Sequence, residues 1–285
     1  MVDASILIPT HRHVSLLPFS LESALDQEGA SVEVLVVGDG VEDATRDVLA
    51  RFEGDERVRF FDLPKGPRRG EAYRHRALEE ARGRVVSYLS DDDLLLRDHA
   101  AIMLELLEKA DFAHSATAWL EPDGRLSHHP WDVARPEFAE VMRSGPNAIG
   151  LTATSHTLAA YRRLPHGWRT TPEGEPTDRH MWLQWLEQPW FRGVGSGRLT
   201  HLQFPDPRWR AMTEEERASV LAHWLARSRS PGFREEIDRM LADAVVRSGE
   251  KYRLEAWASS TELQAVHATR TWRLRKRLVR LRGSG

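Results

Sequence analysis

Residues 85–93 read VVSYLSDDD, and LLLRDHA follows at residues 94–100. The apolar and β-branched beginning of this stretch is typical of a buried strand, yet the strand ends in three consecutive carboxylates, Asp91, Asp92 and Asp93. Like charges on neighbouring residues repel one another, most strongly where solvent is partly excluded. We therefore expect a positive group beside the triplet. The alternative is that the three acids form a solvated turn that caps the next helix.

The rest of the first half of the chain alternates short apolar runs with amphipathic stretches. The runs are ASILIP, VEVLVV, RVRFF and RVVSYL, and the stretches between them lie at residues 16–25, 44–52 and 71–81. This alternation predicts an α/β fold with a Rossmann-like, mostly parallel sheet flanked by helices. FAHSATAWL is another apolar run and meets a turn signal, EPDG. Three helical segments, at residues 214–227, 233–246 and 252–266, are expected to form a helical C-terminal extension.

Composition narrows the class of protein. The chain has 285 residues, a net charge of −3 and no cysteine, which excludes disulfides, thiolate metal sites and cysteine nucleophiles. No apolar run approaches the length of a membrane span, and the first residues lack the charged-then-apolar order of a signal peptide. We therefore expect a cytoplasmic protein.

The positive charges are concentrated at the C-terminal end. Seven basic residues and no acid lie between Arg270 and Arg282, interspersed with apolar residues. A basic amphipathic segment of this kind suits an anionic surface, so we expect peripheral contact with the inner face of a membrane. The alternative is a solvated helix face or a partner-binding arm. Because the remainder of the chain is net acidic, nucleic acid is not expected as a partner.

The position of the acidic triplet suggests its chemistry. In open parallel sheets, ligands bind beyond the carboxyl ends of the strands, where these carboxylates lie. Hard oxygen ligands suit Mg²⁺ or Mn²⁺, which use few protein carboxylates and leave other positions for water and substrate phosphates. A metal ion bound to a diphosphate is therefore the natural counter-charge.

Four motifs that follow one another along the chain indicate a more specific fold: ILIPTHR, VVGDGVED, GEAYRHRALEEARG and YLSDDDLLLRDHA. Together they resemble the family 2 glycosyltransferases, whose nucleotide-sugar domain has the GT-A fold. The resemblance runs from Ala4 to Trp119 and more loosely to Trp190. It implies a metal-dependent, inverting transfer of a hexosyl group from a nucleotide-diphospho-sugar donor to a hydroxyl of a saccharide or lipid-linked acceptor, in polysaccharide or glycoconjugate synthesis.

The resemblance assigns residues to the donor's nucleoside. Pro9 and Thr10 match the step that lies beside the base, and Asp39 matches the acid that hydrogen-bonds the base. This sequence departs from the common Asp-Asp-Gly-Ser pattern, because Gly38 replaces the first acid and Val41 the small hydroxyl residue. These departures leave the identity of the base open.

The resemblance also assigns the diphosphate and metal ligands. Arg69 and Arg74 match basic residues that approach the nucleotide, with solvated helix surface as the alternative. Asp91 is expected near the ribose and Asp92 on the metal, with Asp93 as an outer or alternative metal ligand. A shift of one residue in the alignment would exchange these roles.

A base for the acceptor is expected in EGEPTDRHMWLQWLEQ, residues 173–188. This stretch resembles the one in which an acid opens a helix beneath the acceptor site, and Asp178 matches that acid. A helix N-terminus favours negative charge, which would keep the carboxylate ionised. The alternatives are that Asp178 only caps the helix or that Glu173 or Glu175 is the base.

Other residues are expected to be structural. Trp182, Trp185 and Trp190 fall among apolar residues at helical spacing, so we predict core packing and not sugar stacking. His201 could approach the metal from a late strand, but a lone histidine among apolar residues is more often structural.

We divide the chain into residues 1–118, the nucleotide-sugar-binding part of the GT-A domain, residues 119–207, its acceptor-binding part, and residues 208–285, the helical C-terminal region with the basic tail. One rival is a sugar-phosphate nucleotidyltransferase, which would need a Gly-rich basic loop after the first strand. A haloacid-dehalogenase-type phosphatase would need an aspartate where Pro9 and Thr10 stand. A non-catalytic nucleotide-sugar-binding or scaffold protein on the same fold stays open.

Overall fold

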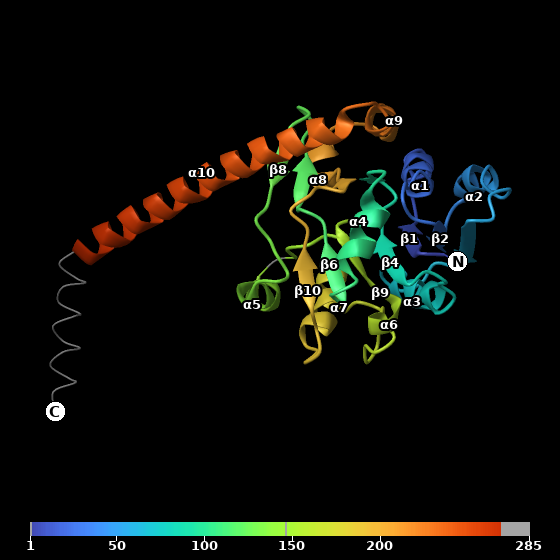
Figure 1. The fold of residues 1–285 in the computed structure, drawn as a ribbon, viewed down its shortest axis with the longest axis horizontal. Helices are drawn as coiled ribbons and strands as arrows, with labels where there is room; N and C mark the ends of the chain where they lie inside the picture. Colours follow the sequence, from blue (N-terminus) through green and yellow to red (C-terminus); the bar gives the residue numbers. More distant parts are fainter. Residues whose placement is uncertain (1, 146, 269–285) are drawn as a thin grey trace.

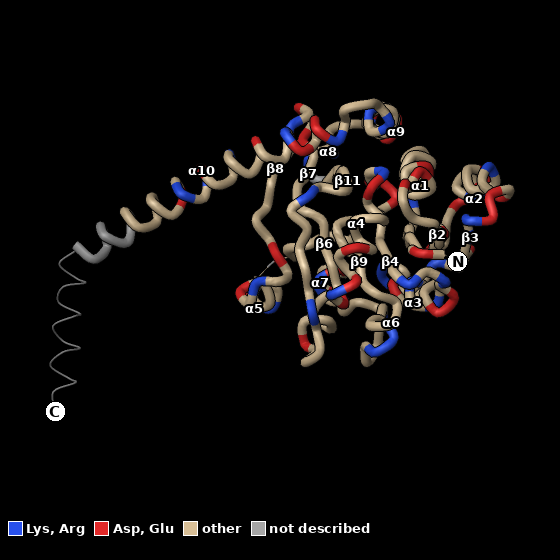
Figure 2. The backbone as a smooth tube through the Cα atoms, viewed as in Figure 1, with Lys and Arg blue, Asp and Glu red and all other residues tan. Residues whose placement is uncertain are grey.

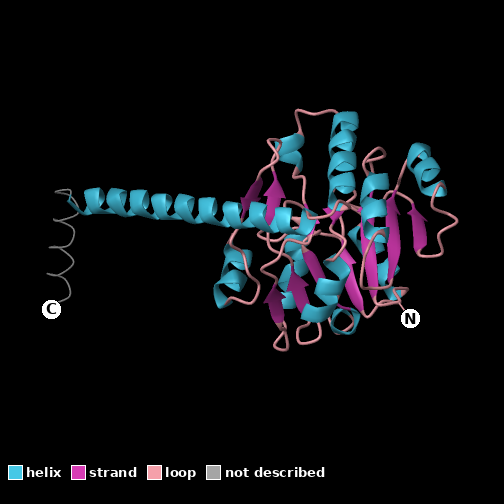
Figure 3. Cartoon of the chain, turned by 45° about the horizontal axis from the view of Figure 1, so that its top comes forward, coloured by secondary structure: helices cyan, strands magenta, loops and turns pink. Residues whose placement is uncertain are grey.

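The computed structural model describes residues 2–145 and 147–268. Its centre is a seven-stranded sheet with helices on both sides (Figures 1 and 3). In spatial order the strands are β10 (Gly193–Gly195), β6 (Phe112–His114), β9 (Thr154–Thr157), β4 (Val85–Tyr88), β1 (Ala4–Thr10), β2 (Val32–Asp39) and β3 (Val58–Leu63). β4, β1, β2 and β3 pair in parallel, as do β10 and β6, whereas β9 runs antiparallel to both of its neighbours. The predicted mostly parallel sheet is confirmed.

Strand periodicity explains the two layers of helices. Successive side chains of a strand point to opposite faces, so Ile6 and Ile8 of β1 join one core cluster and Leu7 joins the other. The first cluster is covered by α1 (Leu17–Leu25), α2 (Asp43–Ala50) and α4 (His99–Leu106). The second is covered by α3 (Glu71–Glu79), α5 (Pro136–Ser144), α6 (Leu158–Tyr161) and α7 (Thr177–Leu186). The predicted core positions Trp182 and Trp185 are buried in the second cluster, and Trp190 packs against it.

Two small antiparallel ribbons extend the body beyond the main sheet. β5 (Leu94–Leu95) pairs with β11 (His201–Leu202), and β7 (Ala118–Leu120) pairs with β8 (Leu126–His128). The apolar run FAHSATAWL forms β6 and then β7. Between these strands Ser115 N donates to Ala153 O, just before β9, and Ala116 N donates to Arg198 O.

The C-terminal helices are α8 (Asp206–Trp209), α9 (Glu214–Ser228) and α10 (Phe233–Ala268). A third core cluster joins Leu221, Trp224 and Ile237 of α9 and α10 to Leu16, Leu94, Leu96 and the β7–β8 ribbon. The two helices expected at residues 233–246 and 252–266 are one continuous helix, because a single glycine, Gly249, lowers helix stability by about 1 kcal/mol without interrupting the backbone ladder.

The end of α10 projects from the body (Figures 1 and 3). Figure 2 shows basic and acidic residues interspersed over the body. Among the described residues, none of the helices combines the length and the apolar character that crossing a bilayer requires. The basic tail from Arg270 to Arg282, for which we predict membrane contact, lies outside the described residues.

Candidate functional site

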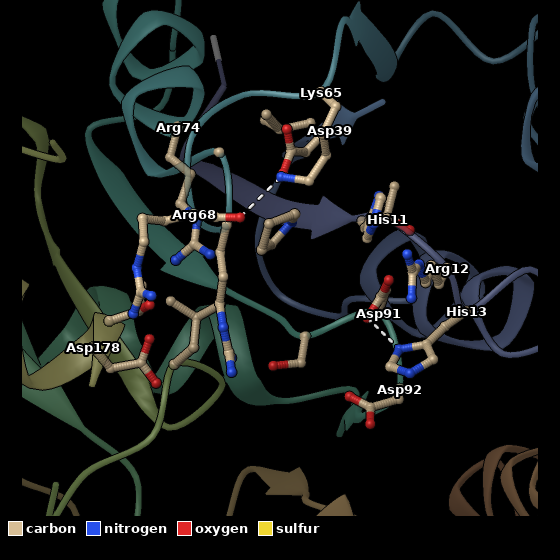
Figure 4. Close-up of a pocket in the computed structure, with 18 residues that line it drawn as sticks. His11, Arg12, His13, Asp39, Lys65, Arg68, Arg74, Asp91, Asp92 and Asp178 are labelled. Atoms are coloured by element: carbon tan, nitrogen blue, oxygen red, sulfur yellow. Dashed lines mark hydrogen bonds and ion pairs between the residues drawn. The ribbon is translucent and has the colours of Figure 1, made fainter. Parts of the chain in front are cut away.

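A cavity of about 520 Å³ opens beyond the carboxyl ends of β1, β2 and β4. The segments that follow these strands line it, together with the loop before α3 and the first turn of α7 (Figure 4). The lining includes Pro9, Thr10, Asp39, Arg69, Arg74, Asp91, Asp92 and Asp178, which are the predicted site residues other than Asp93. The topology therefore brings together side chains that are up to 169 positions apart (Pro9 to Asp178).

Asp39 is held rigidly at the end of β2. Its Oδ2 accepts from Lys65 Nζ at 2.7 Å, and its Oδ1 accepts from Gly66 N at 2.6 Å. Gly70 has φ +62°, and a Cβ at this position would lie 2.6 Å from Asp39 Cγ. The close approach of the backbone at Gly70 thus requires glycine. Lys65 was not predicted as a site residue. The sequence shows only that a basic residue lies in the loop after β3.

The packing also explains why the common acidic pattern is altered after β2. A Cβ at Gly38 would lie 2.9 Å from the ring of Phe60 on β3 and 3.2 Å from Val41 Cγ1. Val41 itself is buried. Phe60 and Val41 therefore occupy the space that a larger side chain at position 38 would need.

Three arginines line the cavity between Asp39 and Asp178: Arg68, Arg69 and Arg74. Arg74 is only 5% exposed, and its guanidinium lies over the ring of Trp168, 4.6 Å from the centroid. Its Nε and Nη1 have no hydrogen-bond partner in the described part of the chain. Burial lowers the pKa of Arg74, while the carboxylates of Asp178 and Glu71 act in the opposite direction.

The three arginines differ in how far they are buried. Arg74 is not the solvated surface residue of the alternative interpretation, whereas Arg69 is exposed at the cavity rim. Arg68, which sequence reasoning missed, is exposed and has the left-handed φ of 56° that non-glycine residues seldom adopt.

The acidic triplet is divided between the cavity and the interior. Asp91 Oδ1 lies 2.8 Å from His13 Nδ1, and Asp92 Oδ2 accepts from Arg217 Nη2 at 2.7 Å. Asp93 turns away, accepting from the Thr152 hydroxyl and, at 2.8 Å, from Phe204 N. The positive groups expected beside the triplet are therefore present in the protein itself.

The electrostatics of the group follow from burial and pairing. The hydrogen bond to Asp91 raises the pKa of His13 to about 9. Burial, followed by the charge of Asp91, raises the pKa of Asp92. Burial also raises the pKa of Asp93, well above its ordinary value.

His13, Asp91 and Asp92 each place one potential ligand atom within 4.8 Å of the other two. A neutral imidazole with two carboxylates is a donor set that Mn²⁺ accepts, so a bound ion would take the place of the proton that His13 shares with Asp91. The carboxylates alone suit Mg²⁺. The residues present therefore fit a divalent cation. Asp93 does not belong to this group, because both of its oxygens are engaged in the interior, and we leave it out of the proposed ligand set.

His13, and not His201, belongs to the candidate metal group. His201 is fully buried in β11, and its ring nitrogens have no partner among the described residues. It does not belong to the candidate metal group, so the structural interpretation of His201 fits its position. His13 was missed; its only signal was the sequence PTHRH, which puts two histidines directly after the first strand.

Asp178 lies in the first turn of α7, as the sequence predicted. Burial raises the pKa of its carboxyl group, while Arg74 and Arg69 act in the opposite direction. Figure 4 shows Asp178 and the group of His13, Asp91 and Asp92 on opposite sides of the view, with Arg68 between them. The alternative bases are placed less well, because Glu175 pairs with Arg179 at 2.6 Å and Glu173 is exposed and does not line the cavity.

A second cavity of about 220 Å³ adjoins the first and is lined by Asn147, Glu175 and Pro176. It shares Arg68, Arg69, Thr177 and Asp178 with the larger cavity. The carboxylate of Asp178 therefore stands where the two spaces meet. This arrangement can hold two substrates with a proton acceptor between them.

Comparison with solved structures supports the GT-A description of the fold. The S. aureus protein TarS, residues 1–349 in complex with UDP-GlcNAc, aligns with a TM-score of 0.55 at 14% identity, covering 85% of this chain and 71% of that one. A mannosyltransferase from Pyrobaculum calidifontis in complex with GDP-Man and Mn²⁺ aligns with a TM-score of 0.51 at 17% identity, covering 96% of this chain and 84% of that one. Both are GT-A glycosyltransferases, so the predicted fold class is confirmed.

Sequence comparison gives the family. A teichuronic acid biosynthesis glycosyltransferase of Bacillus subtilis, named as putative, is 32% identical over 116 residues, which is 40% of this chain and 46% of the relative. A GalNAc(5)-diNAcBac-PP-undecaprenol β-1,3-glucosyltransferase of Campylobacter jejuni is 28% identical over 134 residues, 45% of this chain and 41% of the relative. The matches thus span less than half the length of these curated relatives. The profile of glycosyl transferase family 2 matches residues 5–166, more than half of the sequence, and the chain belongs to that family.

Proposed function

We propose that the protein transfers a hexosyl group from a nucleotide-diphospho-sugar to an acceptor hydroxyl, with inversion and with help from Mg²⁺ or Mn²⁺. One observation carries the proposal: the Asp178 carboxylate lies at the junction of two cavities, and the larger cavity has a candidate metal group on its other side. Solved neighbours in complexes with UDP-GlcNAc and with GDP-Man and Mn²⁺ support this class of donor.

The larger cavity would bind the donor. Pro9, Thr10 and Asp39 would hold the nucleoside, because Asp39 is fixed by Lys65 and presents a carboxylate that can accept from a base. Asp91 would lie beside the ribose while also belonging to the metal group.

The arginines would hold the diphosphate. Arg74 has a buried guanidinium with unpartnered nitrogens at the cavity wall, and Arg69 adds a second positive charge at the rim. Guanidinium groups match phosphate oxygens in geometry.

His13, Asp91 and Asp92 would hold the divalent ion. When bound, the ion supplies Lewis-acid neutralisation of the charge that develops on the leaving diphosphate. Asp178 would accept the proton of the acceptor hydroxyl, so that the oxygen can attack the anomeric carbon from the face opposite the nucleotide. A single displacement of this kind inverts the configuration and needs no covalent enzyme intermediate.

The smaller cavity beside Asp178 would receive the acceptor, a saccharide or a lipid-linked saccharide. The basic tail from Arg270 to Arg282 would hold the protein at the anionic inner face of a membrane. Sedimentation of the full chain with vesicles of anionic and of neutral lipid tests this part. Equal binding to both kinds of vesicle would contradict it.

The main test combines binding with turnover. Thermal unfolding is measured with UDP-, GDP- and dTDP-sugars, each with Mg²⁺, with Mn²⁺ or with EDTA, because a bound ligand stabilises the folded state by mass action. Release of nucleotide is then followed with the stabilising donor. Turnover that requires the metal supports the enzyme. Stabilisation without turnover, identical in wild type and Asp178→Asn, would favour a nucleotide-sugar-binding scaffold.

A further inference from the structure

The C-terminal helix α9 reaches the candidate metal group through its first turn. A capping box fixes this turn, since Thr213 Oγ1 accepts from Glu216 N at 3.2 Å and Glu216 Oε2 accepts from Thr213 N at 2.8 Å. Glu214 Oε1 then accepts from Ser15 N at 2.7 Å, two residues beyond His13. Arg217 follows in the helix and donates to Asp92. Helix α9 thus contacts both segments that carry the candidate metal ligands.

The contact between Arg217 and Asp92 is buried. The side chains of Arg217 and Asp92 are 8% and 15% exposed, and their closest atoms are 2.7 Å apart. Leu221 and Trp224, one and two turns further along α9, are buried in the third core cluster and hold the helix in place. The arginine is therefore a fixed part of the site and the positively charged partner of Asp92.

Asp92 lines the cavity whereas Arg217 does not, so the guanidinium meets the carboxylate from outside the substrate space. Its charge cancels one of the two carboxylate charges that Asp91 and Asp92 offer to a cation. A divalent ion alone is attracted less strongly to such a group. The negative diphosphate of a donor would restore the attraction.

We propose that Arg217 is a built-in counter-cation of the metal site, which makes binding of the divalent ion depend on the donor's diphosphate. This inference rests on the proposed function, because it assumes that Asp92 is a metal ligand. It assigns to the C-terminal region a positioning residue of the donor site. The metal and the nucleotide then bind cooperatively, and the bare protein holds the ion weakly.

The experiment measures Mn²⁺ affinity without any turnover. Free Mn²⁺ is followed by electron paramagnetic resonance during titration of the protein, alone and with saturating UDP or GDP. Arg217→Gln is expected to bind Mn²⁺ alone at least about tenfold more tightly than wild type, because it removes a unit positive charge a few ångströms from a divalent ion. The factor by which the nucleoside diphosphate improves Mn²⁺ binding is expected to fall correspondingly.

Three further variants separate charge from structure. Arg217→Met fills the buried space without charge and is expected to behave as Arg217→Gln, so that one of the two suffices if the other fails to fold. Arg217→Lys keeps the charge and is expected to stay near wild type. Arg229→Gln is the control at the other end of α9, since Arg229 is the C-cap of this helix, pairs with Asp26 and Glu22 at 2.9 and 3.5 Å and does not line the cavity.

The outcomes distinguish this inference from the function on which it rests. Asp92→Asn is expected to lose Mn²⁺ binding with and without nucleotide; if it binds as wild type does, the proposed metal site itself is wrong. If Asp92→Asn loses the ion while both charge-free Arg217 variants bind Mn²⁺ alone no more tightly than wild type, the metal site stands and Arg217 is only a structural ion pair.

Discussion

Replacing Asp178 with asparagine should remove turnover and leave the fold intact. The amide has the shape of the carboxyl group but is a far weaker proton acceptor. Because burial raises the pKa of Asp178 despite the attraction of Arg74 and Arg69, this site favours the neutral carboxyl over the carboxylate relative to water. A neutral amide should therefore not destabilise the protein through its missing charge. We expect the Tm of Asp178→Asn to stay within about 3 °C of wild type, equivalent to about 1 kcal/mol for a domain of this size.

The loss of catalysis should be large by comparison. A positioned general base contributes about 10²- to 10⁴-fold, which corresponds to about 3 to 5 kcal/mol of activation free energy. The assay is nucleotide release at saturating donor and acceptor, and donor affinity is measured separately by calorimetry. We expect kcat to fall at least about a hundredfold, with donor affinity within about threefold, because most donor contacts lie elsewhere in the cavity.

The pH profile gives a second readout of the same group. A base works only in its ionised form, so the wild-type kcat should fall as the pH drops through the raised pKa of Asp178, above the ordinary value of 3.8. Asp178→Asn should lack this acid limb. Glu173→Gln, an exposed neighbour outside the cavity, is the control and should keep full activity. If Asp178→Asn retained more than a tenth of the wild-type kcat, Asp178 would be a structural residue and not the base.

Gly70→Ala should cost at least about 2 kcal/mol more in unfolding free energy than Gly174→Ala, and it should weaken donor binding. Both glycines have positive φ, but only a Cβ at Gly70 would meet Asp39. Equal Tm values for the two variants would contradict this prediction. Asp39→Ala should lower donor affinity at least about tenfold by calorimetry while kcat at saturation changes little, and an unchanged affinity would exclude Asp39 from the donor site. His201 has a pKa lowered to about 3 by burial, so the unfolded chain takes up its proton first as the pH falls below about 6.5. Wild type should therefore lose up to about 2 kcal/mol of stability through this residue between pH 6.5 and 5, a loss that His201→Leu should not show in urea titrations at the two pH values; an identical pH dependence in both proteins would refute it.

The framework of the site was predictable because it depends on local patterns. Apolar runs separated by helical stretches indicate parallel strands, and the carboxyl ends of parallel strands meet at one edge. This reasoning places Thr10, Asp39 and Asp91 together without any tertiary information. The position of Asp178 in the first turn of α7 was likewise predictable from helical spacing.

The division of the acidic triplet was not predictable in the same way. All three aspartates follow one strand, and their side chains separate according to the local turn and to partners that arrive from elsewhere. Asp93 finds Thr152 and Phe204, which are 59 and 111 positions away, and Asp92 finds Arg217 at a separation of 125. Nothing near residues 91–93 in the sequence specifies these contacts, because they depend on how β11 and α9 pack against the sheet.

The distribution of charge in the cavity shows why net charge is a poor guide to the ligand. The chain is net acidic, yet its cavity is lined by five basic side chains other than histidine: Arg12, Lys65, Arg68, Arg69 and Arg74. Two of the acids in the same cavity, Asp39 and Asp92, are already paired with Lys65 and Arg217. An anionic diphosphate would therefore be attracted by the excess positive charge along the arginines. Among the acids that line the cavity, Asp91 and Asp178 would repel it. Because Asp91 also faces His13, the repulsion is concentrated at Asp178, on the side where a donor would present its sugar and not its phosphates. This asymmetry would orient the proposed nucleotide-sugar donor in the cavity before any metal is considered.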